Sequence, residues 1–114
     1  MVEGAGDVVA TYYEAWKTKD FAKLRSVLAD DVTFVGPLGR ANGAAECARG
    51  IEGLAQVTTD IVVQKRWVEG PDVLTWFELH TNVAPPMPVA NWSHVEDGKI
   101  TRIRATFDPR PLTR

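Results

Sequence analysis

Apolar positions in the first half of the chain recur at the three- and four-residue spacing of amphipathic helices. The first stripe predicts a helix near the N-terminus and consists of Val8, Val9, Tyr12, Tyr13 and Trp16. Asp20 can cap a second, short helix that carries Phe21, Leu24, Val27 and Leu28. A third helix is predicted from Asn42 or Gly43 onward, with Cys47, Ile51 and Leu54 on its buried side.

The second half of the chain is rich in β-branched and aromatic residues, which predicts strands. Four strands are expected, over residues 57–69, 72–81, 88–96 and 99–108. Asp97-Gly98 lies between the last two and is a strong hairpin signal. An earlier strand over 30–36 ends at Gly36-Pro37, and residues 36–43 are predicted as a loop. Helices followed by antiparallel strands indicate an α+β domain with helices on one side of a sheet of four or five strands.

Length and charge limit the classes of partner. A chain of 114 residues suits one domain over residues 1–114. Its 13 basic and 15 acidic residues give a net charge of −2, so we expect neither nucleic acid nor a membrane as a partner. The single cysteine, Cys47, excludes an internal disulfide, and the N-terminus lacks the features of a signal peptide. These observations predict a cytoplasmic protein.

Several catalytic and metal-binding motifs are absent from the sequence. There is no glycine-rich phosphate loop, no CxxC and no HExxH. His80, His94 and Glu78 could meet across strands, but they lack the spacing of metal ligands. Cys47 has apolar helical neighbours and is predicted to pack rather than to act as a nucleophile. We therefore expect no metal and no cofactor.

The stretch "DVLTWFELHT" (72–81) alternates regularly but has two unusual faces. One face carries Val73, Thr75, Phe77 and Leu79. The other carries Leu74, Trp76, Glu78 and His80. Alternation alone leaves open whether the second face is wet surface or the lining of a cavity.

The order of elements, with "VVATYYEAWKTKDFAKLRSVLADDVTFVGPLG" and "NWSHVEDGKITRIRATF", resembles the SnoaL-like and ketosteroid-isomerase-like branch of the NTF2-like superfamily. The resemblance covers nearly the whole chain. It implies a cone-shaped, cystatin-like α+β fold, in which about three N-terminal helices wrap a curved antiparallel sheet around an apolar pocket. Members include isomerases, polyketide cyclases, epoxide hydrolases and non-enzymatic binding domains, and many form dimers through the outer face of the sheet.

The resemblance also implies which family residues are kept. Ketosteroid isomerase uses an Asp base and an oxyanion hole of a Tyr and a protonated Asp. The tyrosine falls on Tyr12, the base on Gly36 and the protonated acid on Asn91. Standard steroid isomerisation is therefore not expected. Limonene-type epoxide hydrolases need an Arg and an Asp two apart on the strand at 73–81, which has neither.

The same alignment assigns the two faces of the sheet. It places Leu74, Trp76, Glu78, His80, Asn91, Ser93, Ile103, Ala105 and Phe107 inside the cone, with Trp16 and Phe34 as further walls. Val73, Phe77, Leu79 and Trp92 are then predicted on the outer face, where a homodimer would cover them. Glu78 and His80 are two apart on one strand and can interact, so either is a candidate for the missing base; alternatively both lie at the rim and only solubilise the sheet.

The predicted function is an enzyme that performs cofactor-independent general acid/base chemistry on a hydrophobic, oxygenated ring compound. Isomerisation, cyclisation and dehydration are the reaction types that fit. Tyr12 and Asn91 would hold an oxygen, and Glu78 or His80 would move the proton. The alternatives are a non-catalytic ligand-binding or assembly module, as Gly36 suggests, and a dimerisation domain whose cone is filled.

Overall fold

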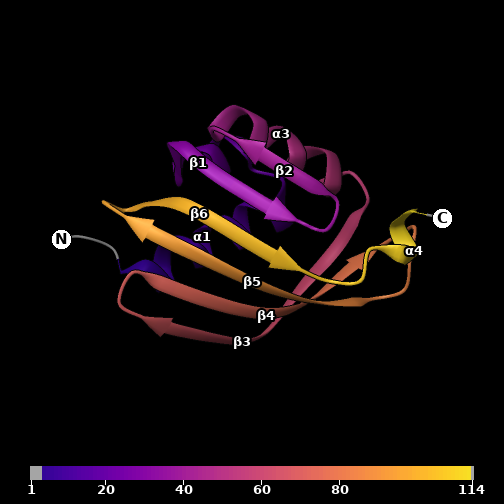
Figure 1. The fold of residues 1–114 in the computed structure, drawn as a ribbon. Coiled ribbons are helices and arrows are strands. Elements are labelled where there is room, and N and C mark those ends of the chain that lie inside the picture. The colour runs from indigo at the N-terminus through magenta and orange to yellow at the C-terminus, as the bar shows by residue number, and fades with distance from the viewer. Residues whose placement is uncertain (1–3, 114) are drawn as a thin grey trace.

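Six strands form one curved sheet, and helices α1, α2 and α3 pack against its inner face (Figure 1). The computed structural model describes residues 4–113. Its elements are, in order, α1 (Ala5–Thr18), α2 (Phe21–Ser26), β1 (Leu28–Gly36), β2 (Gly39–Asn42), α3 (Ala44–Ala55), β3 (Thr58–Glu69), β4 (Asp72–Thr81), β5 (Met87–Glu96), β6 (Lys99–Thr106) and α4 (Arg110–Thr113). Among these residues, no helix has the length and apolar character needed to cross a membrane.

The strands lie in the order β2-β1-β6-β5-β4-β3. Neighbouring strands are antiparallel except β1 and β6, which are parallel and join the N-terminal and C-terminal parts of the chain. The pairing register shifts twice along β3 and once each along β1 and β5. Because such irregularities bend and twist a strand, they account for the curvature that wraps the sheet around the helices.

The predicted helical stripe of α1 forms the centre of the core. Val8, Val9, Tyr12, Tyr13 and Trp16 are all buried. Two of these rings pack on Phe77 of β4: the centroid of Tyr13 lies 5.0 Å from it and that of Trp16 lies 6.1 Å from it. The Trp16 indole donates a hydrogen bond to the Thr58 hydroxyl at 3.2 Å. Aromatic side chains therefore fill the space between α1 and β4.

The local signals in the sequence predict most element boundaries correctly. Asp20 caps α2 by accepting a hydrogen bond from the backbone N–H of Lys23. Asp97 and Gly98 both adopt positive φ, at 52° and 75°, as a tight β5–β6 hairpin requires. The prediction of a loop over 36–43 is wrong in part, because β2 returns along β1 within it. β2 has only four residues and no apolar alternation, so no periodic signal marks it.

The predicted faces of β4 are reversed. Val73, Phe77 and Leu79 lie in the core, whereas Leu74 and Trp76 are exposed on the outer face together with Glu78 and His80. The predictions for β5 are correct: Asn91 and Ser93 are buried, and Trp92 points outward.

The pairing register explains this reversal. Thr75 lies directly opposite Asn91, and Val73 lies opposite Ser93. Directly opposite residues of an antiparallel pair share one face of the sheet. The inward positions of Asn91 and Ser93 therefore require Thr75 and Val73 to point inward, and an alignment displaced by one residue on β4 exchanges its two faces.

Candidate functional site

A pocket of about 430 Å³ opens between α3, the β1–β2 hairpin and the segment that follows β6. Two residues predicted to line the ligand site, Phe34 and Phe107, form part of its wall. The other lining residues are Gly36, Pro37, Leu38, Gly39, Arg40, Ala41, Cys47, Arg49, Gly50, Ile51, Gly53 and Leu54. The volume lies within the usual range for small-molecule sites.

The pocket wall is apolar apart from three side chains. Arg40 of β2 and Arg49 of α3 are its charged residues, and Cys47 contributes a thiol. Within the described part of the chain, no Asp, Glu or His belongs to the wall. The pocket can therefore take up an apolar molecule, but it offers no carboxylate or imidazole as a general base.

Gly36, where the family resemblance places the catalytic base of ketosteroid isomerase, lies in this wall. A Cβ atom added there would meet the ring of Phe34 at 3.0 Å. A side chain at position 36 would therefore be in tight contact with the Phe34 ring, which would have to shift by a few tenths of an ångström.

Cys47 lies between the pocket and the core. Its thiol points toward the carbonyl oxygens of Val32 and Ala41, at 4.0 and 3.9 Å. Burial raises the pKa of this thiol, and the neighbouring Glu46 carboxylate raises it further. Cys47 is therefore a weakly reactive thiol at neutral pH.

Tyr12 is buried behind Cys47, with 1% of its surface exposed. Burial raises the pKa of the phenol strongly, and the nearby Cys47 thiol adds to this effect. Within the described part of the chain, the Tyr12 hydroxyl has no hydrogen-bond partner. Such a group is costly to bury, by about 1–3 kcal/mol.

Asn91 and the remaining predicted interior residues lie on the inner face of β5 and β6. The Ser93 hydroxyl donates a hydrogen bond of 3.0 Å to the Asn91 side-chain oxygen. Ile103 is fully buried, and Trp16 belongs to the core. None of Asn91, Ser93, Ile103 and Ala105 belongs to the pocket wall.

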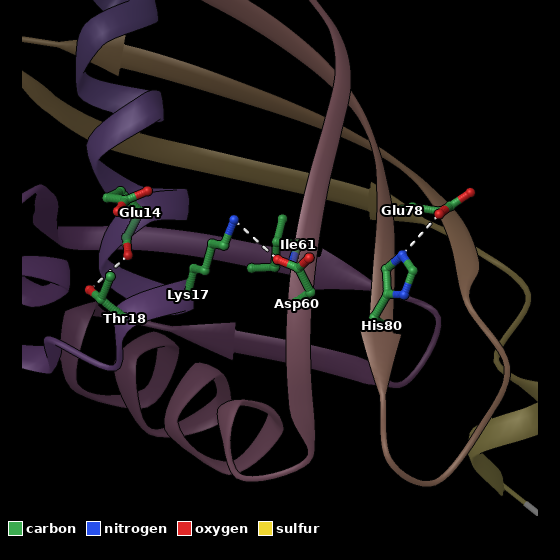
Figure 2. Close-up of polar contacts among 7 residues, drawn as sticks. All are labelled: Glu14, Lys17, Thr18, Asp60, Ile61, Glu78 and His80. Atoms are coloured by element: carbon green, nitrogen blue, oxygen red, sulfur yellow. Dashed lines mark hydrogen bonds and ion pairs between the residues drawn. The ribbon is translucent and has the colours of Figure 1, made fainter.

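Glu78 and His80 interact as predicted, but not inside the cone. The His80 Nε2 and Glu78 Oε1 atoms are 2.9 Å apart, and the two side chains remain 31% and 39% exposed for His80 and Glu78 respectively. They lie on the outer face of β4, beside the Lys17–Asp60 ion pair that joins α1 to β3 (Figure 2). The sheet thus separates this pair from the pocket. The catalytic roles of Tyr12, Glu78, His80 and Asn91 remain predictions.

The outer face of the sheet carries an exposed apolar patch, here called the outer patch. Its members are Trp67, Leu74, Trp76 and Trp92. They adjoin because Leu74 pairs with Trp67 on one side and with Trp92 on the other. Lys65 lies 5.5 Å from the Trp67 ring centroid, and Arg102 lies 5.6 Å from that of Trp92.

A second histidine cluster borders the outer patch. The Asp72 carboxylate accepts hydrogen bonds from the Trp92 indole and pairs with His94 Nδ1, both at 2.8 Å. These bonds, that of His94 first, lower the pKa of Asp72. Within residues 4–113, no group of three or more His, Cys, Asp or Glu side chains is arranged to hold a metal ion.

The sequence prediction missed Arg40 and Arg49 as site residues. Arg40 stands in the segment 36–43, which has no periodicity, and only the return of β2 along β1 brings it to the pocket. Arg49 stands on the third helix, but outside the positions predicted as its buried side. The one signal available was the predicted buried side of the third helix, where Cys47, Ile51 and Leu54 face the same space.

Comparison with known proteins agrees with this architecture. The sequence model of the SnoaL-like domain matches residues 9–103. An NTF2-like protein of unknown function from Cytophaga hutchinsonii is 28% identical, with a TM-score of 0.87 over 100% of this chain and 97% of that one. A protein from Kribbella flavida is 26% identical, with a TM-score of 0.88 over 93% and 88%.

One of the more distant structural neighbours is an enzyme. An LEH-like epoxide hydrolase from M. tuberculosis shares the fold at 22% identity, with a TM-score of 0.80 over 95% of this chain and 85% of that one. Among curated proteins, none matches the sequence.

Proposed function

Because this chain belongs to the SnoaL-like domain family, we propose that it binds a largely apolar small molecule in the pocket between α3 and the β1–β2 hairpin. The observation that carries the proposal is the composition of the wall, where Phe34, Ile51, Leu54 and Phe107 surround a preformed space. Apolar walls with a few polar groups are typical of ligand sites.

The size of the pocket limits the ligand. A volume of about 430 Å³ corresponds to roughly 14 water molecules at ~30 Å³ each. A ligand with one or two fused rings, or a short alkyl chain, fits such a space. A larger polycyclic molecule would project from the mouth.

Binding without catalysis is supported by two positions. Gly36 provides no base, and the Phe34 ring lies close to the point where a side chain at this position would begin. Glu78 and His80 lie on the opposite face of the sheet and cannot reach a molecule in the pocket.

The proposal is tested by filling the pocket from α3. An added Cβ at Gly50 meets no atom within 4 Å, and Gly50 lies in the pocket wall. The leucine side chain of Gly50→Leu should therefore occupy the pocket. Gly50→Ala is the control, because it gains a similar amount of helix propensity, on the order of 1 kcal/mol, but its side chain is too small to fill the pocket. Isothermal titration calorimetry should show that 2-naphthamide binds wild type and Gly50→Ala with similar affinity. Its affinity for Gly50→Leu should be lower by at least roughly tenfold. Equal affinity for all three proteins would refute the site.

A second candidate function is acid/base catalysis of the isomerase, cyclase or dehydratase type. The observation that favours it is the buried Tyr12 hydroxyl, which lacks a partner and lies next to Cys47 in the pocket wall. A ligand oxygen that reached this hydroxyl would be held in a desolvated site, with Asn91 as the second donor implied by the family resemblance. In that case Tyr12→Phe weakens the binding of 2-naphthamide; in a pocket without this contact it leaves the affinity unchanged.

A second copy of this chain is the proposed partner of the outer patch. Exposed indoles dominate this patch, and charged side chains of both signs border it, among them Lys65, Asp72 and Arg102. A two-fold axis through the patch would bury the indoles of both copies and let border charges of opposite sign meet across the interface. We expect sedimentation of wild type as a dimer, and Trp76→Ser to shift it toward the monomer. A monomeric wild type at tens of micromolar would contradict this.

A further inference from the structure

Arg40 and Arg49 come from different elements, β2 and α3, yet both line the pocket. They are its charged lining residues, and both side chains are exposed at its mouth. Among residues 4–113, no carboxylate belongs to the wall that could neutralise them. Two cations therefore border an otherwise apolar space.

Neither guanidinium is used to hold the fold together. Within the described residues, Arg40 and Arg49 form no hydrogen bond or ion pair, while the other arginines near the sheet do have contacts. Arg66 donates to Thr75, and Arg104 donates to the Thr33 backbone and side chain. The two pocket arginines thus keep their full donor capacity for a ligand.

We propose that the ligand of this pocket is an amphipathic anion, an apolar ring or chain that ends in a carboxylate, with the carboxylate held at the mouth by Arg40 and Arg49. This inference rests on the proposed binding function and specifies its ligand class. The apolar part lies against Phe34, Ile51 and Phe107, and the anion remains at the solvent end, where its desolvation is incomplete.

The chemistry of arginine favours a carboxylate at this place. The guanidinium is planar, keeps its charge at all accessible pH values and matches the two oxygens of a carboxylate. The protein as a whole carries a net charge of −2, yet the charged side chains of the pocket wall are both cationic. A cationic ligand would meet repulsion here, and a neutral one would lack the charge–charge attraction to the two guanidinium groups.

The test compares two probes of nearly the same shape. 2-Naphthoate carries the carboxylate, and 2-naphthamide replaces it with a neutral amide. We expect calorimetry at low salt to give an affinity for naphthoate roughly tenfold higher than for naphthamide, as charge-assisted hydrogen bonds at a partly exposed site allow. In the double variant Arg40→Gln/Arg49→Gln this preference should disappear.

Arg25→Gln is the matched control. Arg25 is exposed on α2 and does not belong to the pocket wall, so its replacement changes the net charge without touching the site. It should keep the preference for naphthoate. Added salt should reduce the preference in wild type and leave the affinity for naphthamide unchanged.

The outcomes separate the two proposals. Equal affinity for naphthoate and naphthamide, or a preference that survives in Arg40→Gln/Arg49→Gln, overturns the anion inference while the pocket still binds an apolar molecule. Failure of wild type to bind either probe at millimolar concentration overturns the proposed function together with it.

Discussion

Neighbouring residues Trp76 and Phe77 of β4 give a direct test of which face of the sheet is buried. Phe77 is 1% exposed and packs on Tyr13 and Trp16, whereas Trp76 is 40% exposed on the outer face. Phe77→Ala should therefore remove a large part of the core, and Trp76→Ala should remove little. The face assignment predicted from the sequence, with Trp76 inside and Phe77 outside, requires the larger loss for Trp76→Ala.

The magnitude follows from the burial of each ring. Truncation of a fully buried Phe to Ala costs about 3–5 kcal/mol, because a cavity remains beside Tyr13 and Trp16. A partly exposed Trp contributes much less, and we expect a loss of no more than about 1 kcal/mol for Trp76→Ala. A domain of this length has a total stability of about 6–17 kcal/mol, so at the lower end of this range Phe77→Ala would come near the limit of folding.

Urea denaturation followed by far-UV circular dichroism measures both free energies of unfolding. Phe77→Leu keeps most of the volume and provides a measurable variant if Phe77→Ala does not fold. Dimer formation through the outer patch would add a dependence on protein concentration to the effect of Trp76→Ala, so the comparison is made at two concentrations. A larger loss for Trp76→Ala than for Phe77→Ala at both concentrations would refute the described packing of β4.

Three further predictions concern single groups. Tyr12→Phe removes a buried hydroxyl that has no hydrogen-bond partner among the described residues. The free energy of unfolding measured in urea titrations should therefore stay constant or rise by about 1 kcal/mol. A loss of more than about 1 kcal/mol would show that the hydroxyl is hydrogen-bonded. Hydrogen bonds from His94 and Trp92 lower the pKa of Asp72 below its ordinary 3.8, so the carboxylate stabilises the fold above that pH and the contribution is lost as pH falls through the lowered pKa. Asp72→Asn should therefore flatten the decline of the free energy of unfolding below about pH 4. An unchanged slope would contradict this prediction. Cys47 should react with a disulfide reagent far more slowly at pH 8 than a free thiol, because burial and Glu46 raise its pKa. Because Cys47 lines the pocket, bound 2-naphthamide should slow the reaction further. A rate that saturating naphthamide leaves unchanged would place the probe elsewhere.

The architecture could be predicted from the sequence because its signals are local. The stripe from Val8 to Trp16, the cap at Asp20 and the Asp97-Gly98 turn each depend on a few neighbouring residues, and each is present in the structure. β2 has no comparable signal. It forms because Gly39–Asn42 pairs with β1, and no local sequence pattern indicates this pairing.

The face of β4 could not be read from alternation, since both faces contain large apolar residues. The deciding contact is non-local: Thr75 pairs with Asn91 and must share its face. The same limit explains the pocket, because the packing of α3 on the β1–β2 hairpin places Arg40 and Arg49 in the wall of one pocket. By contrast, the pairing of Glu78 with His80 follows from their spacing on one strand and was predictable.

The central claim is that a small apolar molecule binds between α3 and the β1–β2 hairpin, and intermolecular nuclear Overhauser effects with 2-naphthamide test it most directly. We predict contacts from the naphthalene protons to Phe34, Ile51, Leu54 and Phe107. Contacts to the indole groups of Trp67, Trp76 and Trp92 instead would place the ligand on the outer patch and contradict the claim.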